Sequence, residues 1–236
     1  MTKAGWTAAA RPVLAQAPIL RGPVPPDDRA ERIGCFDAVR FRAGDCIYRQ
    51  GERDTRLYVV LAGKVKIGWS SADNPPAKLL AVIGPPDIFG AESMFDPPGP
   101  HADSATALTN VCAAVIDREK LQACIAGSPH VTERLMRVLA RGLQRTEDLI
   151  TDLNFTDVPG RIAKQLLSLS QRFGVRRDNQ LHLDHDLTQA EIAQLVCASR
   201  ESVNKTLSEF AQRGWITVSG KRIVIHQTEP LARRAR

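Results

Sequence analysis

The chemistry that is easiest to interpret lies between residues 187 and 212, where two short amphipathic helices are predicted. Thr188-Gln189-Ala190-Glu191 has the spacing of a capping box, in which the threonine hydroxyl accepts from the Glu191 N–H and the glutamate reaches back. A short turn at Cys197-Ala198 separates this helix from a second one, which Ser199 caps. Two short helices joined by a tight turn favour a helix-turn-helix over an ordinary helical hairpin.

The second of these helices has an inner and an outer face. The inner face is apolar at positions i, i+4 and i+7, which are Val203, Leu207 and Phe210. On the outer face, Arg200 or Lys205 can donate to guanine O6 and N7, while Glu201 can accept from cytosine N4. Phosphate contacts, which hydroxyls and helix N-termini make without sequence preference, are expected from Thr188, Gln189, Ser199 and Ser202.

A β-hairpin is predicted after the second helix. The apolar runs 214–218 and 222–225 flank the turn signal Ser219-Gly220-Lys221. Such a hairpin is the wing of a winged helix, and Lys221 and Arg222 at its tip can add phosphate contacts.

The charge of the chain is unevenly distributed. Residues 1–157 hold 19 Lys+Arg and 19 Asp+Glu, whereas residues 158–236 hold 13 against 7, which accounts for the net charge of +6. A basic C-terminal third indicates a polyanionic partner such as double-stranded DNA, the alternative being a merely solvated basic face.

The preceding elements must position this DNA-reading region. An Ala- and Pro-rich lead-in at 1–30 is expected to be poorly ordered, with one short helix at most. Residues 31–127 then show short predicted strands separated by turns that contain glycine. This pattern predicts an antiparallel β-roll and an α+β fold for the chain. The strands are expected at Val39–Phe41, Cys46–Tyr48, Arg56–Leu61, Lys64–Ile67, Leu79–Ile83 and Val111–Ile116.

Residues 128–155 switch to helical periodicity. Ser128 followed by Pro129 is a helix start signal, and small or apolar residues then recur at alternating spacings of four and three. This seam predicts a homodimer, the alternative being one helix packed on its own roll. The expected interface residues are Leu135, Leu139, Gly142, Thr146, Leu149 and Leu153. The winged helix then occupies 156–236.

Several other classes of protein are disfavoured. The chain has no GxSxG, P-loop or HExxH motif, so an enzyme is not predicted. The run 181–186 could suggest a metal site but fits a strand entering the helix-turn-helix better, so no metal is predicted. Five cysteines without CxxC spacing favour free buried thiols. No apolar run reaches the roughly 20 residues of a membrane span, and no signal peptide is evident, so a cytoplasmic protein without membrane contact is expected.

Four segments resemble hallmarks of the CRP/FNR family, most closely of the actinobacterial cyclic-AMP receptor proteins: Phe155 to Arg161, Leu187 to Gln189, Ala198 to Lys205 and Arg213 to Trp215. The similarity runs from Val13 to Arg236. It implies a cyclic-nucleotide-binding β-roll, a long dimer helix and a winged helix. It also implies a homodimer on a two-fold operator with TGTGA-like half-sites, and contact with RNA polymerase.

In the helix-turn-helix the resemblance is nearly complete. Arg200, Glu201 and Lys205 match the base readers of the family, although the third is usually arginine. Cys197 stands where the turn often has glycine, so a left-handed backbone there would be strained.

The sensor loop departs further from the family. In the family, a glutamate after the Phe-Gly turn binds the ribose, and an arginine together with a hydroxyl residue binds the cyclic phosphate. Ala91, His101 and Ala102 stand at these three positions. On the dimer helix Thr146 matches a purine-contacting threonine, while Glu147 replaces an asparagine. The expected degenerate pocket comprises Gly90, Ala91, Glu92, Ser93, His101, Ala102, Thr146 and Glu147.

A neutral histidine cannot supply the bidentate, permanently charged grip of arginine. Losing a charged phosphate partner costs about 3–5 kcal/mol, roughly three decades of affinity. Cyclic AMP is the cofactor that the family implies, and its binding is expected to be weak or absent. The alternatives are a cyclic-AMP-responsive regulator with a rearranged pocket, and a cyclic-nucleotide-binding signalling module whose DNA role is secondary.

Overall fold

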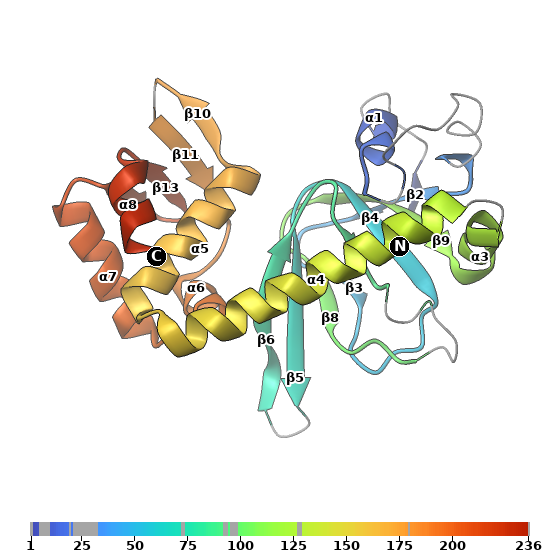
Figure 1. Cartoon of the computed structure of the whole chain (residues 1–236), viewed down its shortest axis with the longest axis horizontal. Helices are drawn as coiled ribbons and strands as arrows, with labels where there is room; N and C mark the ends of the chain where they lie inside the picture. Colours follow the sequence, from blue (N-terminus) through green and yellow to red (C-terminus); the bar gives the residue numbers. More distant parts are fainter. Residues whose placement is uncertain are drawn as a thin grey trace. The chain divides into compact units, whose positions relative to one another are not determined.

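Two antiparallel sheets form the N-terminal unit, Met1–Leu143, of the computed structural model (Figure 1). The structure describes residues 2–4, 10–18, 20, 33–71, 74–91, 94, 99–126, 129–178 and 180–235. In order, the first sheet holds β1 (Thr2–Ala4), β2 (Asp37–Phe41), β9 (Val111–Asp117), β4 (Arg56–Ala62) and β7 (Ile88–Phe89). The second holds β3 (Cys46–Tyr48), β8 (Ser104–Ala107), β5 (Val65–Ser71) and β6 (Asn74–Ile83). The predicted β-roll is therefore confirmed, although β7 and β8 were not anticipated.

Strand alternation gives this unit two cores. Along β4, Leu57 and Val59 point into one cluster, and Tyr58 and Val60 point into the other, because successive side chains of a strand face opposite sides. The second cluster draws on strands of both sheets and therefore fills the space between them. The interior of the roll is thus packed with the protein's own side chains.

The lead-in contains one short helix, as predicted. Helix α1 (Ala10–Ala15) and the turns after it place Leu14, Ala17 and Leu20 in the first core cluster. These apolar residues recur every third position, so one face of the segment can be buried. Residues 21–30 of the lead-in lie outside the described residues.

Two helices follow the roll. Helix α3 (Arg118–Ala126) was not predicted, whereas the long helix α4 (Pro129–Phe155) follows the heptad pattern (Figure 1). The predicted cap Ser128 lies outside the described residues.

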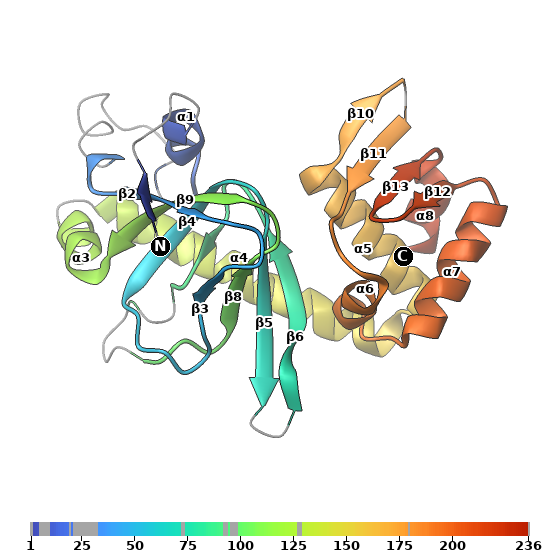
Figure 2. The ribbon, with the colours of Figure 1, turned by 180° about the vertical axis from the view of Figure 1, so that it is seen from behind.

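The second unit, Gln144–Arg236, contains the predicted winged helix (Figure 2). Its helices are α5 (Val158–Phe173), α6 (Gln189–Leu195), α7 (Arg200–Gln212) and α8 (Thr228–Arg234). Its sheet has the order β10 (Val175–Arg177), β11 (Gln180–Asp184), β13 (Arg222–Ile225) and β12 (Ile216–Ser219). The run 181–186 accordingly belongs to a strand and the loop after it.

The cysteines are free but not buried as predicted. Cys46 and Cys197 are exposed, and Cys35, Cys112 and Cys124 are half-buried. Within the described ranges, no helix is both long and apolar enough to cross a membrane.

Candidate functional site

Local hydrogen bonds fix the starts of both helices of the helix-turn-helix. At α6 the predicted capping box is present: Thr188 Oγ1 accepts from Glu191 N at 3.2 Å, and Thr188 N donates to Glu191 Oε2 at 2.8 Å. At α7, Ser199 Oγ accepts from Ser202 N at 3.1 Å. Caps of this kind stabilise a helix by about 1 kcal/mol each.

The turn between the helices is strained and is held by a residue from another helix. Cys197 has φ +49°, which is the left-handed conformation anticipated from the usual glycine. Arg161 of α5 donates from Nε to the Val196 carbonyl (2.8 Å), from Nη2 to that of Cys197 (3.2 Å) and from Nη1 to that of Thr156 (2.7 Å). Arg161 belonged to a segment with family resemblance, but periodicity alone carried no sign of this role.

Helix α7 presents the predicted faces. Val203, Leu207 and Phe210 are buried, and the Phe210 ring lies 5.3 Å from that of Trp215. Ser199, Arg200, Glu201 and Lys205 are exposed, and Ser202 is half-buried. Gln189 lines an open groove of about 530 Å³ with Asn204, Ser208 and Thr217. The outer face is therefore polar and accessible.

Glu201 stays ionised on this face. Its own backbone N–H and the Ser199 hydroxyl hydrogen-bond the carboxylate, which holds the pKa of Glu201 below its ordinary value. A carboxylate is an acceptor only, as hydrogen bonding to cytosine N4 requires.

The wing is a tight hairpin. Ser219 pairs with Arg222 across a two-residue turn in which Gly220 has φ +59°, a conformation that glycine adopts readily. Arg222 Nε lies 2.6 Å from Asp184 Oδ1 in an exposed ion pair, while the Lys221 side chain is exposed at the tip. Lys221 is therefore placed more openly than Arg222 for contact with phosphate.

In the sensor unit, the loop after β7 leaves little room. Gly90 has φ +74°, and a Cβ on it would lie 2.9 Å from the Arg56 carbonyl oxygen. Ala91 is half-buried and packs against the first core cluster. Glu92 and Ser93 lie outside the described residues.

His101 is built into the interior of the roll. It is 1% exposed, and its ring stacks on Tyr48 with centroids 3.7 Å apart and planes 10° apart. The Tyr48 hydroxyl donates to Asp103 Oδ1 at 2.9 Å, while Ala102 is exposed. Imidazole thus occupies the position where the family has its phosphate-binding arginine, and a carboxylate lies close by.

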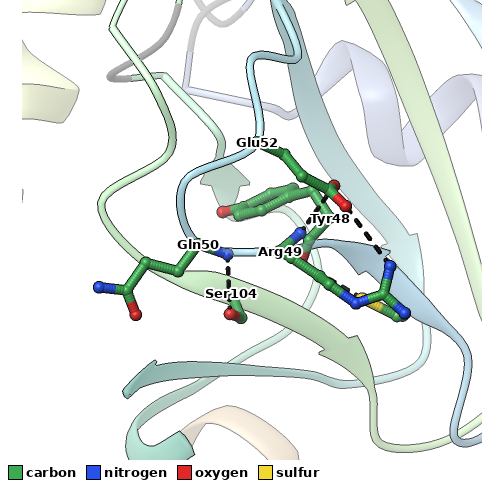
Figure 3. Close-up of polar contacts among 6 residues, drawn as sticks. Tyr48, Arg49, Gln50, Glu52 and Ser104 are labelled. Atoms are coloured by element: carbon green, nitrogen blue, oxygen red, sulfur yellow. Dashed lines mark hydrogen bonds and ion pairs between the residues drawn. The ribbon is translucent and has the colours of Figure 1, made fainter. Parts of the chain in front are cut away.

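The segment around His101 is joined to the loop after β3. Gly51 N donates to the His101 carbonyl and His101 N to the Glu52 carbonyl, each at 2.9 Å. Figure 3 shows Gln50 N donating to Ser104 Oγ at 2.9 Å.

The arginines of this region are engaged by carboxylates. Arg49 pairs with Glu52 at 3.4 Å (Figure 3), and Arg56 pairs with Asp54 at 2.6 Å. The bond to Asp54 raises the pKa of Arg56. Neither guanidinium is available to a phosphate without giving up its ion pair.

Helix α4 carries a broad apolar strip, which is the group of exposed residues Met136, Leu139, Leu143, Leu149, Ile150, Leu153 and Phe155. Leu143 is 63% exposed and Ile150 is 55% exposed, yet neither was in the predicted seam. Leu135 was in that seam, but it is 4% exposed and packs in the first core cluster of its own chain. Gly142, Thr146 and Glu147 are exposed on the same helix.

Within the described part of the chain, no group of three His, Cys, Asp or Glu side chains could hold a metal ion.

A roll of this type followed by a winged helix defines a ligand-sensing class of DNA-binding regulators.

Comparisons with known proteins identify the family. A model of the cyclic nucleotide-binding domain matches residues 38–128, and one of the Crp-like helix-turn-helix domain matches residues 160–234. The chain is 50% identical over 224 residues to a CRP-like cAMP-activated global transcriptional regulator of Mycobacterium tuberculosis, covering 95% of this chain and 99% of that protein.

Solved structures share the fold of this chain. FixK2 from Bradyrhizobium japonicum superposes with a TM-score of 0.75 at 21% identity, covering 85% of this chain and 98% of that one. A CRP/FNR-family regulator from Thermus thermophilus superposes with a TM-score of 0.71 at 26% identity, covering 84% of this chain and 97% of that one. The chain belongs to the CRP/FNR family, whose members are transcriptional regulators and not enzymes.

Proposed function

We propose that this chain is a homodimeric regulator that reads a two-fold operator with TGTGA-like half-sites and responds weakly or not at all to cyclic AMP. The observation that carries the proposal is a contrast within one chain. The reading helix is capped and exposed, whereas the position of the phosphate-binding arginine holds a stacked histidine that is 1% exposed.

The apolar strip on α4 supports the homodimer. Seven large apolar side chains are exposed along one helix, and their burial against a second copy would remove them from water. Leu139, Leu143, Thr146, Ile150 and Leu153 follow the alternating spacing of four and three that parallel helices use. A two-fold dimer places two copies of α7 one helical turn of DNA apart.

Base reading follows from the outer face of α7. Arg200 and Lys205 donate to guanine, and Glu201 accepts from cytosine. Gln189 and Lys221 contact phosphates, together with the backbone N–H groups at the starts of α6 and α7. The hydroxyls of Thr188, Ser199 and Ser202 are already used as caps or cap partners, so their phosphate contacts are secondary.

The weak response to cyclic AMP follows from the charge of the ligand. A cyclic phosphate is a permanent anion, and its burial requires a permanent cation and aligned donors. Ala91 and Ala102 offer no side-chain donor, and Asp103 adds negative charge close to the His101–Tyr48 stack. A ligand that does not bind cannot shift the equilibrium between DNA-competent and incompetent states.

A second candidate is a cyclic-AMP-responsive regulator with a rearranged pocket. The relative that shares 50% identity is named as cAMP-activated, and the cyclic nucleotide-binding model covers the whole roll. This candidate requires His101 to leave its stack on Tyr48 when the ligand enters. Contact of either regulator with RNA polymerase is part of the proposal on family grounds.

A gel shift with a TGTGA-N6-TCACA duplex separates these candidates. We expect specific binding without cyclic AMP and no more than a twofold change when 100 μM cyclic AMP, roughly a physiological excess, is added. The matched variant Ala91→Glu, His101→Arg, Ala102→Thr should gain a response to the ligand. A strong gain in affinity with cyclic AMP in the natural chain supports the second candidate, and absence of specific binding rejects both.

A further inference from the structure

Two cysteines that are far apart in the sequence meet in the N-terminal unit. The sulfur of Cys124 lies 3.6 Å from the sulfur of Cys35, and the two residues are 89 positions apart. Cys35 lies in the turn before β2, and Cys124 lies on α3. The sequence carried no sign of this pair, because neither cysteine has a second one at short spacing.

Packing holds the two thiols near each other. Both side chains lie against the first core cluster, which also contains Phe36 beside Cys35 and Leu121 one turn before Cys124. Both cysteines are half-buried, so they are neither sealed in the core nor free to swing into solvent. A sulfur–sulfur bond is about 2.05 Å long, so the two sulfurs must approach each other by about 1.5 Å to form one.

We propose that Cys35 and Cys124 are a redox modification site, which a hydroperoxide converts to an intramolecular disulfide that fastens α3 to the edge of the roll. One thiolate attacks the peroxide and becomes a sulfenic acid, releasing one molecule of water or alcohol. The second thiolate then attacks that sulfur and displaces hydroxide. The hydroxide takes up a proton and leaves as water. Two thiols are thereby oxidised to one disulfide, and one peroxide is reduced. The proposal stands independently of whether cyclic AMP binds.

Cys46 and Cys197 have different surroundings, whereas Cys112 is also half-buried and packs against the first core cluster. Cys46 Sγ donates to the Tyr48 carbonyl at 3.4 Å, and partial burial raises the pKa of this thiol. Since the thiolate is the reactive form, Cys46 is a poor competitor although it is exposed. Cys197 Sγ contacts the Gln194 carbonyl at 3.7 Å in the other unit. These two residues therefore provide matched controls.

The test treats the full-length reduced protein with hydrogen peroxide and then alkylates the remaining thiols with a maleimide. Intact mass should show that the natural chain loses two of its five reactive thiols. Non-reducing digestion should yield a peptide that joins Cys35 to Cys124. Cys35→Ser and Cys124→Ser should each fail to form that peptide, whereas Cys46→Ser and Cys197→Ser should form it as the natural chain does.

Thermal unfolding provides a second readout on the same samples. A bond that closes a loop of this length restricts the unfolded chain strongly, so the melting temperature of the N-terminal unit should rise on oxidation and return with dithiothreitol. Cys35→Ala should melt like the reduced natural chain and show no rise. Five thiols still reactive after peroxide, or cross-linked peptides that join other cysteines or two chains, would overturn the proposal.

Discussion

The reading helices and the sensor loop depart from the family pattern to very different degrees. In the first region, both helix caps, the buried inner face and the exposed outer face are all present. In the second, the family resemblance implies that Ala91, His101 and Ala102 stand in place of the three groups that would hold a cyclic nucleotide. We therefore propose that the DNA-reading chemistry is kept while the response to cyclic AMP is weakened or lost.

The difference arises from how each region is held together. The helix-turn-helix depends on capping hydrogen bonds at fixed spacings, so loss of a capping residue such as Thr188 or Ser199 would destabilise the unit. The sensor loop depends on a few charged side chains that are needed only by the ligand. Replacing them leaves the roll intact, because Ala91 packs against a core cluster and His101 stacks on Tyr48. Under the proposed function, the chain would lose the response to cyclic AMP without losing the fold of the roll.

The largest effect is expected from a charge on the α4 strip. Ile150→Asp would bury an unpaired carboxylate twice in the dimer, which costs at least about 3 kcal/mol. Light scattering at micromolar concentration should show monomers, and operator affinity should fall by two orders of magnitude or more. Gln144→Asp adds the same charge to an exposed position that is not part of the apolar strip and should stay dimeric. A dimeric Ile150→Asp protein would place the interface elsewhere.

Removing the arginine that holds the strained turn should weaken the reading unit itself. Arg161→Ala deletes three hydrogen bonds to backbone carbonyls and should lower the free energy of unfolding by about 3 kcal/mol. Arg161→Lys keeps the charge but cannot span the three acceptors, so it should recover only part of the loss. Urea denaturation followed by circular dichroism measures the free energy of unfolding of both variants. Unchanged stability in Arg161→Ala would show that the turn is held by other contacts.

Removal of a single side chain should impair base reading. Arg200→Ala should cost about 1–3 kcal/mol on the specific duplex and flatten discrimination at one base pair. Lys221→Ala should instead weaken specific and scrambled duplexes alike and reduce the salt dependence. Gel shifts on both duplexes give the ratio of the affinity for specific DNA to the affinity for scrambled DNA. If Arg200→Ala kept the natural ratio, α7 would not be the helix that reads bases.

The smallest effect is expected at the turn residue. Cys197 has φ +49°, so Cys197→Gly should relieve the left-handed strain and raise the stability of the unit by about 0.5 kcal/mol after the entropic cost of glycine. Cys197→Ala retains a Cβ and should melt like the natural protein. A lower melting temperature for Cys197→Gly would indicate that the strain is compensated by the contacts of Arg161.

Local signals made the reading unit predictable. The capping box at Thr188 and the cap at Ser199 depend on residues a few positions apart, and the structure contains both. The left-handed backbone at Cys197 was implied by the family resemblance and is also present. The contacts of Arg161 with Val196 and Cys197 span about 35 positions and left no local trace.

The N-terminal unit was less predictable for the same reason. Strand β8 was not predicted, because its pairing with β3 and β5 is set by distant residues. The burial of Leu135 and the exposure of Leu143 and Ile150 depend on where the roll covers α4 and where it does not. Heptad spacing identified the helix, but it could not separate the covered part from the open part.

Titration calorimetry of the natural chain with cyclic AMP at pH 7.5 tests the central claim most directly. With His101 stacked in the interior and no side-chain cation in the place of the family's arginine, the loss of about 3–5 kcal/mol predicts no saturable heat below millimolar ligand. A dissociation constant in the micromolar range or tighter would contradict this account of the sensor.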